Sequence, residues 1–209
     1  MENVYNKFAG RSVERLCAIS DGLFAVAMTL LLIEVHPPLK EAIHSEADLC
    51  RALQHMFPQL LMFLMGFLTL GIFWVGQQTQ LNHFKESDRN LTWIHLTFLA
   101  VVSAVPFSTA LLAEFPTYRT ALGFYWLNVL LLGLFLLWSW RYGVAANLVK
   151  EDVPADVSKA TYRRILAAQG LYALGAALCV FGTWWSIGFI FLMQLNYAVA
   201  PKIRGLFRI

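Results

Sequence analysis

Charged residues are scarce in this sequence: they make up 14% of its 209 residues, whereas 58% of the residues are hydrophobic. Soluble domains average about 25% charged and about 45–50% apolar residues. A soluble fold of this length could not keep so much apolar surface away from water. The composition therefore excludes an ordinary soluble protein and indicates a chain that is solvated by lipid.

Cysteines and the common catalytic motifs are also scarce. The three cysteines, Cys17, Cys50 and Cys179, are too few and too widely spaced for a disulfide framework or a metal site. There is no glycine-rich phosphate loop, zinc-binding helix motif or nucleophile elbow, and no two of the five histidines are four residues apart. These absences argue against an enzyme and against a bound cofactor or metal.

Long hydrophobic runs are abundant. A bilayer core of about 30 Å needs about 20 mostly apolar residues per helix. The first run contains Asp21 and is longer than the core of a cleaved signal, so we expect it to be retained. We expect a tight turn at Gly182 and Thr183. The sequence thus predicts an all-α membrane protein, one domain over 1–209, with six transmembrane helices at about 15–35, 53–77, 91–113, 121–142, 162–181 and 184–200.

The basic residues lie unevenly about these runs, which predicts the orientation. Basic residues gather on the cytoplasmic side of membrane proteins. Their place between the runs also argues against nucleic acid as a partner, despite a net charge of +3. With six spans, we expect a protein of the cell membrane with both termini on the cytoplasmic side. Three basic residues fall on the outer side, Lys40, Arg51 and Arg119, and thirteen on the inner side, Lys7, Arg11, Arg15, Lys85, Arg89, Arg141, Lys150, Lys159, Arg163, Arg164, Lys202, Arg204 and Arg208.

The first hydrophobic run differs from the others because it contains ionisable groups. Arg15 and Asp21 lie near its start and Glu34 at its end. Ionisable residues inside a membrane helix are costly and usually face a bundle interior or a water-filled path. They therefore mark this helix as a candidate functional element. The alternative is that Arg15, Ser20 and Asp21 only hold the helix start at the membrane interface.

The same run also carries an apolar stripe at helical spacing. Its members are three or four residues apart, with Thr29 beside the stripe: Ile19, Gly22, Val26, Leu30 and Ile33. Such a stripe in a membrane helix more often packs against a neighbour or faces lipid than forms a gate. The residues alone leave both possibilities open.

Three stretches carry a resemblance to a known family. Arg15, followed four to six residues later by Ile19-Ser20-Asp21, resembles the R-x-x-x-F-S-D signature of the transmembrane protein 175 family. That family comprises the lysosomal potassium channel of animals and shorter prokaryotic homologues. The following residues 22–34, Trp74 in the second span and residues 106–114 also look like the family. The resemblance covers roughly the first 115 residues.

The resemblance implies a potassium channel in the cell membrane, built as a homotetramer of six-span subunits. The first helix of each subunit would line a central pore, without the T-V-G-Y-G filter, which this sequence indeed lacks. Val26, Leu30 and Ile33 would form a hydrophobic constriction, and Thr29 would offer hydroxyl ligands to K⁺. Selectivity for potassium over sodium would be weak. The implied partners are further copies of the chain, the lipid bilayer and K⁺, with no cofactor beyond the permeant ion.

The resemblance also implies supporting roles. A polar network would join the helices at the cytoplasmic end, and it comprises Arg15, Ser20, Asp21, Trp74 and Gln77. His95 of the third span is added to it as a candidate partner of Arg15 and Asp21, and the alternative is a satisfied structural histidine. Glu34 would lie at the outer mouth, where it either concentrates cations or is only a hydrated helix end. The chain departs from the family in two places. Ile19 replaces the phenylalanine of the signature, and Gln77 and Gln78 stand where many relatives carry histidines. Glutamine forms hydrogen bonds but does not titrate.

Two other functions remain open from the sequence. One is an ion- or proton-coupled secondary transporter that uses Asp21, although carriers often have helices broken near their middle, and Pro58 and Pro106 lie toward helix ends. The other is a membrane scaffold that does not conduct, in which Asp21 and Thr29 only take part in packing.

Overall fold

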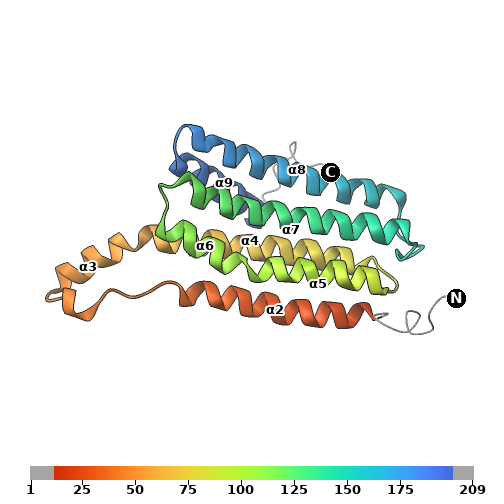
Figure 1. Ribbon diagram of the computed structural model, residues 1–209, viewed down its shortest axis with the longest axis horizontal. Coiled ribbons are helices and arrows are strands. Elements are labelled where there is room, and N and C mark those ends of the chain that lie inside the picture. The colour runs from red at the N-terminus through yellow and green to blue at the C-terminus, as the bar shows by residue number, and fades with distance from the viewer. Residues whose placement is uncertain (1–11, 200–209) are drawn as a thin grey trace.

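The described part of the computed structural model covers residues 12–199 and is a bundle of long helices (Figure 1). Within this range the only extended pairing is an isolated bridge between Phe84 and Val149. The predicted all-helical fold class is thereby confirmed. The elements are α2 (Val13–Ile33), η1 (Lys40–Ala42), α3 (Glu46–His55), α4 (Phe57–Asn82), α5 (Arg89–Ser103), α6 (Val105–Glu114), α7 (Arg119–Ala145), α8 (Ala155–Ala177), η2 (Leu178–Val180) and α9 (Thr183–Val199).

Four segments are long and apolar enough to cross a membrane. They are α2, α4, the combined α5 and α6 over Arg89–Glu114, and α7. The last two helices are weaker candidates: α9 has 17 residues, and the first ten residues of α8 include Asp156, Lys159, Arg163 and Arg164. The count of six spans therefore stays a prediction.

Local sequence explains where these helices begin, break and turn. The Ser12 hydroxyl accepts a hydrogen bond from the Arg15 N–H at 3.3 Å and starts α2. Between α5 and α6 the chain breaks at Ala104, because Pro106 has no N–H to donate to the preceding turn. Gly182, at φ +146°, forms the turn before α9 at the position expected from the sequence.

A short helix, α3, lies beyond the end of the bundle, between α2 and α4 (Figure 1). It begins at a capping box, in which the Ser45 hydroxyl accepts from the Asp48 N–H at 3.2 Å and donates to Asp48 Oδ2 at 2.8 Å. Because α3 continues to His55, α4 begins at Phe57, four residues after the expected start of the second span.

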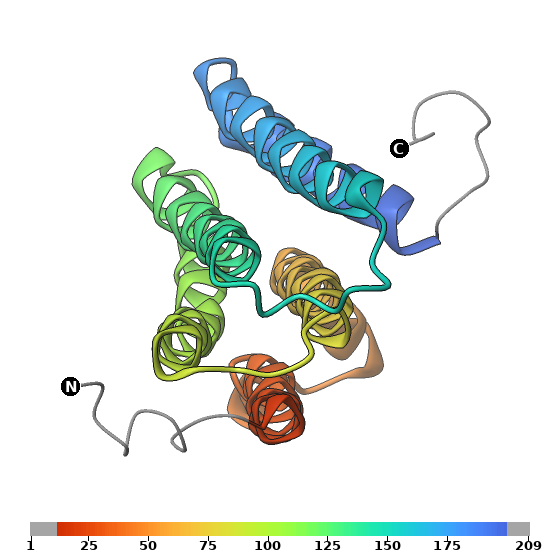
Figure 2. The same cartoon turned by 90° about the vertical axis from the view of Figure 1, so that its right-hand side faces the viewer.

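Helix α2 occupies one edge of the bundle. It packs against α4, α5 and α6, whereas α8 packs against α7 and α9 on the far side. The view along the bundle in Figure 2 shows α2 at the opposite edge from the α8–α9 pair. The large apolar core between them includes Phe24, Met65, Phe98, Leu132 and Ile190. One side of α2 therefore has no neighbour within the described chain.

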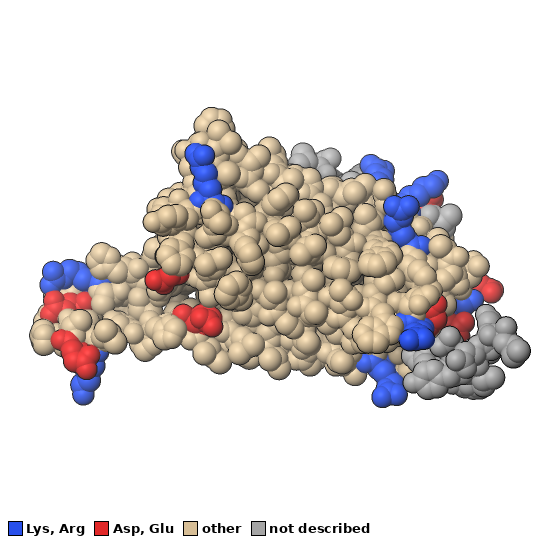
Figure 3. Space-filling model, in the orientation of Figure 1, with Lys and Arg blue, Asp and Glu red and all other residues tan. Residues whose placement is uncertain are grey.

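Charged side chains lie toward the two ends of the bundle. On the face shown in Figure 3, the broad middle carries no Lys, Arg, Asp or Glu. Such an uncharged band is the pattern of a surface that faces lipid. The basic residues Lys7, Arg11, Lys202, Arg204 and Arg208 of the predicted asymmetry lie outside the described residues.

Candidate functional site on helix α2

Helix α2 has a buried face that fixes it to the bundle. Its members recur every three or four residues, which is the period of one face of a helix: Leu16, Ser20, Phe24, Ala27 and Leu31. Phe24 is 1% exposed and lies 6.2 Å from the Phe98 ring of α5, centroid to centroid. The buried face fixes the orientation of α2 about its own axis, and this orientation determines which of its residues remain on the surface.

The predicted stripe lies on the surface of the subunit. Val26 is 57% exposed, Leu30 41% and Ile33 66%, and Ile19, about two turns nearer the start, is 48% exposed. These side chains are apolar, β- or γ-branched, and follow one another over about 10 Å of helix from residue 26 to residue 33. A single subunit leaves this stripe uncovered, so either lipid or another copy of the chain covers it in the membrane.

Thr29 is exposed beside the stripe, and its hydroxyl has a defined orientation. Oγ1 donates its hydrogen to the Val26 carbonyl oxygen at 2.8 Å. A hydroxyl has one hydrogen and two lone pairs. Because the hydrogen is held by the backbone, the lone pairs of Oγ1 remain available on the exposed side. Thr29 is therefore an acceptor toward anything that occupies the space in front of α2.

A buried polar cluster joins α2 to α4 and α5. The Ser20 hydroxyl lies 2.7 Å from His95 Nε2 and accepts from Gln77 Nε2 at 2.9 Å. Gln77 Nε2 also lies 3.0 Å from His95 Nε2. Ser20 is 0% exposed, Gln77 2% and His95 3%. Hydrogen bonds of this kind are stabilising where neither water nor lipid offers a polar partner. The structure thus brings together three of the six residues expected in the network.

A second set of contacts joins Asp21 to α4. Asp21 Oδ1 accepts from Trp74 Nε1 at 2.8 Å and from Gln78 Nε2 at 2.6 Å. Trp74 and Gln78 are four residues apart and therefore share a face of α4. Asp21 and Trp74 were both expected in the network but not as a pair, and Gln78 was not expected there, although its spacing from Trp74 was a usable signal.

Two predicted site residues stand apart from these clusters. Within residues 12–199, the Arg15 side chain is exposed and forms no hydrogen bond or ion pair, so the described chain does not join it to Asp21 or His95. Glu34 is exposed at the C-terminal end of α2, where its carbonyl oxygen lies 3.0 Å from His36 Nδ1. Both side chains are free to face water.

A buried polar cluster on the other side of the bundle was not expected from the sequence. Gln194 Nε2 of α9 donates to Thr69 Oγ1 of α4 at 2.7 Å, and it lies 3.2 Å from the Tyr125 hydroxyl and 3.1 Å from the Tyr172 hydroxyl. The Tyr125 and Thr69 hydroxyls are 2.6 Å apart. This cluster ties the α8–α9 pair to α4 and α7. Its four residues come from four helices, and no local sequence pattern predicts contacts between such distant residues.

With this geometry described, the relatives of the chain can be compared with it. Residues 15–106 match the family described as the endosomal/lysosomal potassium channel TMEM175. The chain is 30% identical over 193 residues to a potassium channel of Streptomyces collinus, and the match spans 90% of this chain and 84% of that one. The chain belongs to the TMEM175 family.

A further relative and a solved structure also match this chain over most of its length. A potassium channel of Chamaesiphon minutus is 28% identical over 189 residues, which is 88% of this chain and 93% of that one. The crystal structure of a lysosomal potassium-selective channel TMEM175 homolog from Chamaesiphon minutus matches with a TM-score of 0.78 and 26% identity, covering 90% of this chain and 97% of the other. The family consists of ion channels, so this chain is a membrane protein of that class and not an enzyme. The resemblance drawn from the sequence is confirmed.

Proposed function

We propose that the protein is a potassium-selective channel, weakly selective over sodium, in which α2 of each of four identical subunits lines a central pore. The observation that carries this proposal is the uncovered stripe of Val26, Leu30 and Ile33 on a helix that is buried on its other face. A membrane protein of a channel family needs a wall for its ion path. Among the described helices, α2 combines such a stripe with firm anchoring and an edge position (Figure 2).

The constriction consists of rings of Val26, Leu30 and Ile33 from the four copies of α2. Rings of branched apolar side chains narrow a pore until water leaves it, which closes the path to ions. A small outward movement of the helices readmits water and opens it. The exposed fractions of these side chains leave them room to meet their counterparts from other subunits.

Selectivity arises at Thr29. Four Oγ1 atoms, each with its hydrogen directed to the Val26 carbonyl, present lone pairs to an ion in the path. Potassium holds its water less tightly than sodium does, so a site with few and weak oxygen ligands favours potassium. A ring of hydroxyls offers fewer ligands than stacked rings of backbone carbonyls. The preference for potassium is accordingly weak.

The polar clusters hold the pore helix in place at its cytoplasmic end. Ser20 bonded to Gln77 and His95 fixes the buried face of α2, and Asp21 bonded to Trp74 fixes its flank. These groups act on the pore through helix position and do not bind the permeating ion. Gln77 supplies hydrogen bonds and does not titrate, so this position of the network stays neutral over the physiological pH range.

The outer mouth is acidic in character. Between α2 and α4 lie four carboxylates, Glu34, Glu41, Glu46 and Asp48, and two basic residues, Lys40 and Arg51. A hydrogen bond from the Ser45 hydroxyl is the main cause that holds the pKa of Asp48 below its usual range, with Arg51 contributing. The excess of negative charge concentrates cations at the entrance.

Both chain termini are cytoplasmic, and the channel resides in the cell membrane.

Potassium flux into liposomes tests the proposal. Purified protein is reconstituted in vesicles, and a potassium gradient is set up across the vesicle membrane. Potassium flux is followed with a membrane-potential dye. Vesicles without protein give the blank, and valinomycin defines the maximum flux. We expect dissipative flux that needs no second ion. Flux that requires a proton or sodium gradient and is abolished by Asp21→Asn would replace the channel with a coupled transporter.

A further inference from the structure

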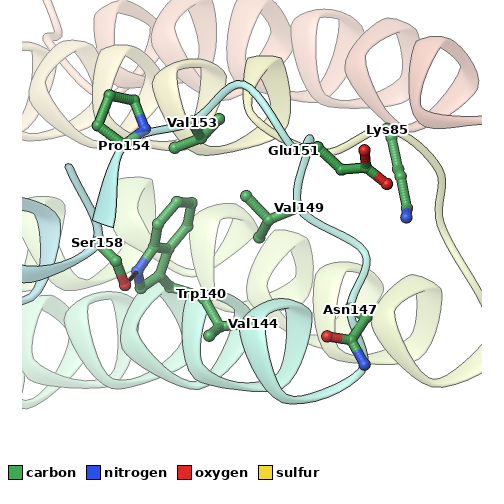
Figure 4. A pocket seen from close by; sticks show the side chains of 9 residues that line it. All are labelled: Lys85, Trp140, Val144, Asn147, Val149, Glu151, Val153, Pro154 and Ser158. Carbon is green, nitrogen blue, oxygen red and sulfur yellow. Dashed lines mark hydrogen bonds between the residues drawn. The ribbon is translucent and has the colours of Figure 1, made fainter. Parts of the chain in front are cut away.

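A cavity of about 450 Å³ lies at the end of the bundle where α4 turns into α5 and α7 into α8 (Figure 4). It is separate from α2 and its polar clusters. Its walls come from the last turns of α7, the loop that follows, the turn after α4 and the first turn of α8: Lys85, Trp140, Val144, Asn147, Val149, Glu151, Val153, Pro154 and Ser158.

The frame of this cavity is well bonded. The turn after α4 and the loop after α7 are joined by two backbone hydrogen bonds, Lys85 N–H to Leu148 O and Lys150 N–H to His83 O, both 2.9 Å. Phe84 stacks on Trp140 at 5.8 Å between centroids, and the Trp140 indole N–H donates to the Ser158 hydroxyl at 3.2 Å. The cavity is thus a built feature of the fold.

The lining is divided into a polar end and an apolar end. Lys85, Asn147 and Glu151 belong to the loops beyond the helix ends and lie together on one side in Figure 4. Trp140 and Val144 belong to the last two turns of α7, a membrane-spanning candidate, and the loop valines lie near Trp140. The polar end therefore faces the water side of the interface, and the apolar end points toward the membrane.

The two charges at the polar end have no partners of their own. Among the described residues, neither the Lys85 ammonium nor the Glu151 carboxylate takes part in an ion pair or a side-chain hydrogen bond. Both side chains are exposed. A ligand that carries one negative and one positive group could pair with both charges at once. A simple anion would pair with Lys85 but would be repelled by Glu151.

We propose that this cavity binds the headgroup and upper chain of a zwitterionic phospholipid of the phosphoethanolamine type. The phosphate pairs with Lys85 and the amide of Asn147, and the primary ammonium pairs with Glu151. An ammonium with hydrogens suits a carboxylate better than a quaternary one, because it donates hydrogen bonds. The start of the acyl chain lies along Trp140 and Val153, where aromatic and aliphatic groups meet the membrane interface.

Native mass spectrometry of the detergent-purified protein tests this assignment. Dipalmitoyl phosphatidylethanolamine, dipalmitoyl phosphatidylglycerol and water-soluble O-phosphoethanolamine are titrated separately, and the fraction of lipid-bound protein is measured. We expect the ethanolamine lipid to bind most tightly. Lys85→Ala and Glu151→Gln should each weaken it about tenfold, the effect of losing one charge-assisted hydrogen bond.

Neighbouring residues supply matched controls. Lys159→Ala and Asp152→Asn remove the same charges from exposed positions that do not line the cavity, and they should leave binding unchanged. Equal weakening by Lys159→Ala would show diffuse attraction and overturn the site. Equal affinity for the glycerol lipid, unaffected by Glu151→Gln, would overturn the zwitterion. Equal affinity for O-phosphoethanolamine would overturn the lipid in favour of the free headgroup.

Discussion

At the scale of single residues, Thr29 and Leu30 are neighbours on α2 with different chemistry. Thr29 is an oxygen acceptor whose hydrogen is held by the Val26 carbonyl, and Leu30 is an exposed branched apolar side chain. If α2 lines the pore, the first governs which ion passes and the second governs whether water and ions pass at all. The two functions can be separated by substitution because the side chains do not depend on each other.

For Thr29→Ala, we expect a current that persists but is less selective. Thr29→Ala removes one hydroxyl from each of the four subunits of the proposed pore. A loss of about 1 kcal/mol in the preference of this ring for potassium should lower the potassium-to-sodium permeability ratio about fivefold. Thr29→Ser keeps the hydroxyl and should keep the ratio. Thr97→Ala is the matched control, since that exposed threonine of α5 donates in the same way to Trp93 O at 2.8 Å. A ratio unchanged in Thr29→Ala would remove Thr29 from the selectivity site.

For Leu30→Ala, we expect a larger basal current at the same protein density, because a wider apolar ring keeps its water. Planar-bilayer recordings of open probability and conductance measure this effect. Leu134→Ala serves as the control: it is an exposed leucine of α7, 48% exposed against 41% for Leu30. Equal currents in the wild type and in Leu30→Ala would contradict a constriction at this ring.

The sequence could predict the surface stripe of α2 but only some of the contacts that hold α2 against the other helices. Val26, Leu30 and Ile33 share a face because helical period is a local property, and that face is exposed as the pattern allowed. Their place in a pore stays a prediction. Partners from different helices depend on packing, so no local rule predicts the contact of Ser20 with His95, 75 residues later. His95 had been named only as a candidate partner of Arg15 and Asp21.

At the scale of helices, α2 is stabilised from one side only. Ser20→Ala removes the hydroxyl that bonds both Gln77 and His95 and leaves those buried groups poorly satisfied. The expected cost is about 2 kcal/mol, which lowers the apparent melting temperature by about 4–8 °C.

Thermal unfolding in detergent, followed by intrinsic fluorescence or light scattering, measures that shift. Ser103→Ala is the matched control, because the Ser103 hydroxyl bonds only to Leu99 O of its own helix, at 3.1 Å. Equal melting temperatures for Ser20→Ala and the wild type would mean that the hydrogen bonds of the Ser20 hydroxyl contribute nothing to stability.

The α8–α9 pair depends on Gln194 in a similar way. Gln194→Leu introduces an apolar side chain of comparable size. It removes the hydrogen bond that the Tyr172 hydroxyl accepts from Gln194, whereas the Thr69 and Tyr125 hydroxyls keep each other as partners. We expect faster hydrogen exchange in α8 and α9 and unchanged exchange in α2. Asn196→Leu, an exposed change two residues away, should alter neither. Uniform protection in Gln194→Leu would show that apolar contacts alone hold the pair.

Helix ends were predictable where a side chain or a proline fixes them. The turn at Gly182 follows from its backbone freedom, and the break before α6 follows from Pro106. Helix α3 was missed although Ser45 and Asp48 form a capping box, because its ten residues have no long apolar run. Length and hydropathy mark membrane spans but not short polar helices, so the expected second span began at residue 53, inside α3.

At the scale of the whole molecule, the edge position of α2 leaves its stripe to lipid or to another copy of the chain. A bundle with α2 in its centre would bury the stripe within one chain, whereas here the stripe is uncovered and the large core lies elsewhere. In the proposed channel, assembly around α2 covers the stripe and creates a path in one step. The fold class and the family followed from the sequence, and the number of copies is not encoded in any local pattern.

The reversal potential tests the central claim most directly. Purified protein is inserted in a planar bilayer with equal concentrations of potassium chloride on one side and sodium chloride on the other. The account predicts a current that reverses at a voltage displaced toward the potassium equilibrium potential, and a displacement that shrinks in Thr29→Ala. A current that reverses at zero in the wild type, which is also the chloride equilibrium potential under these conditions, would contradict a potassium-selective pore lined by α2.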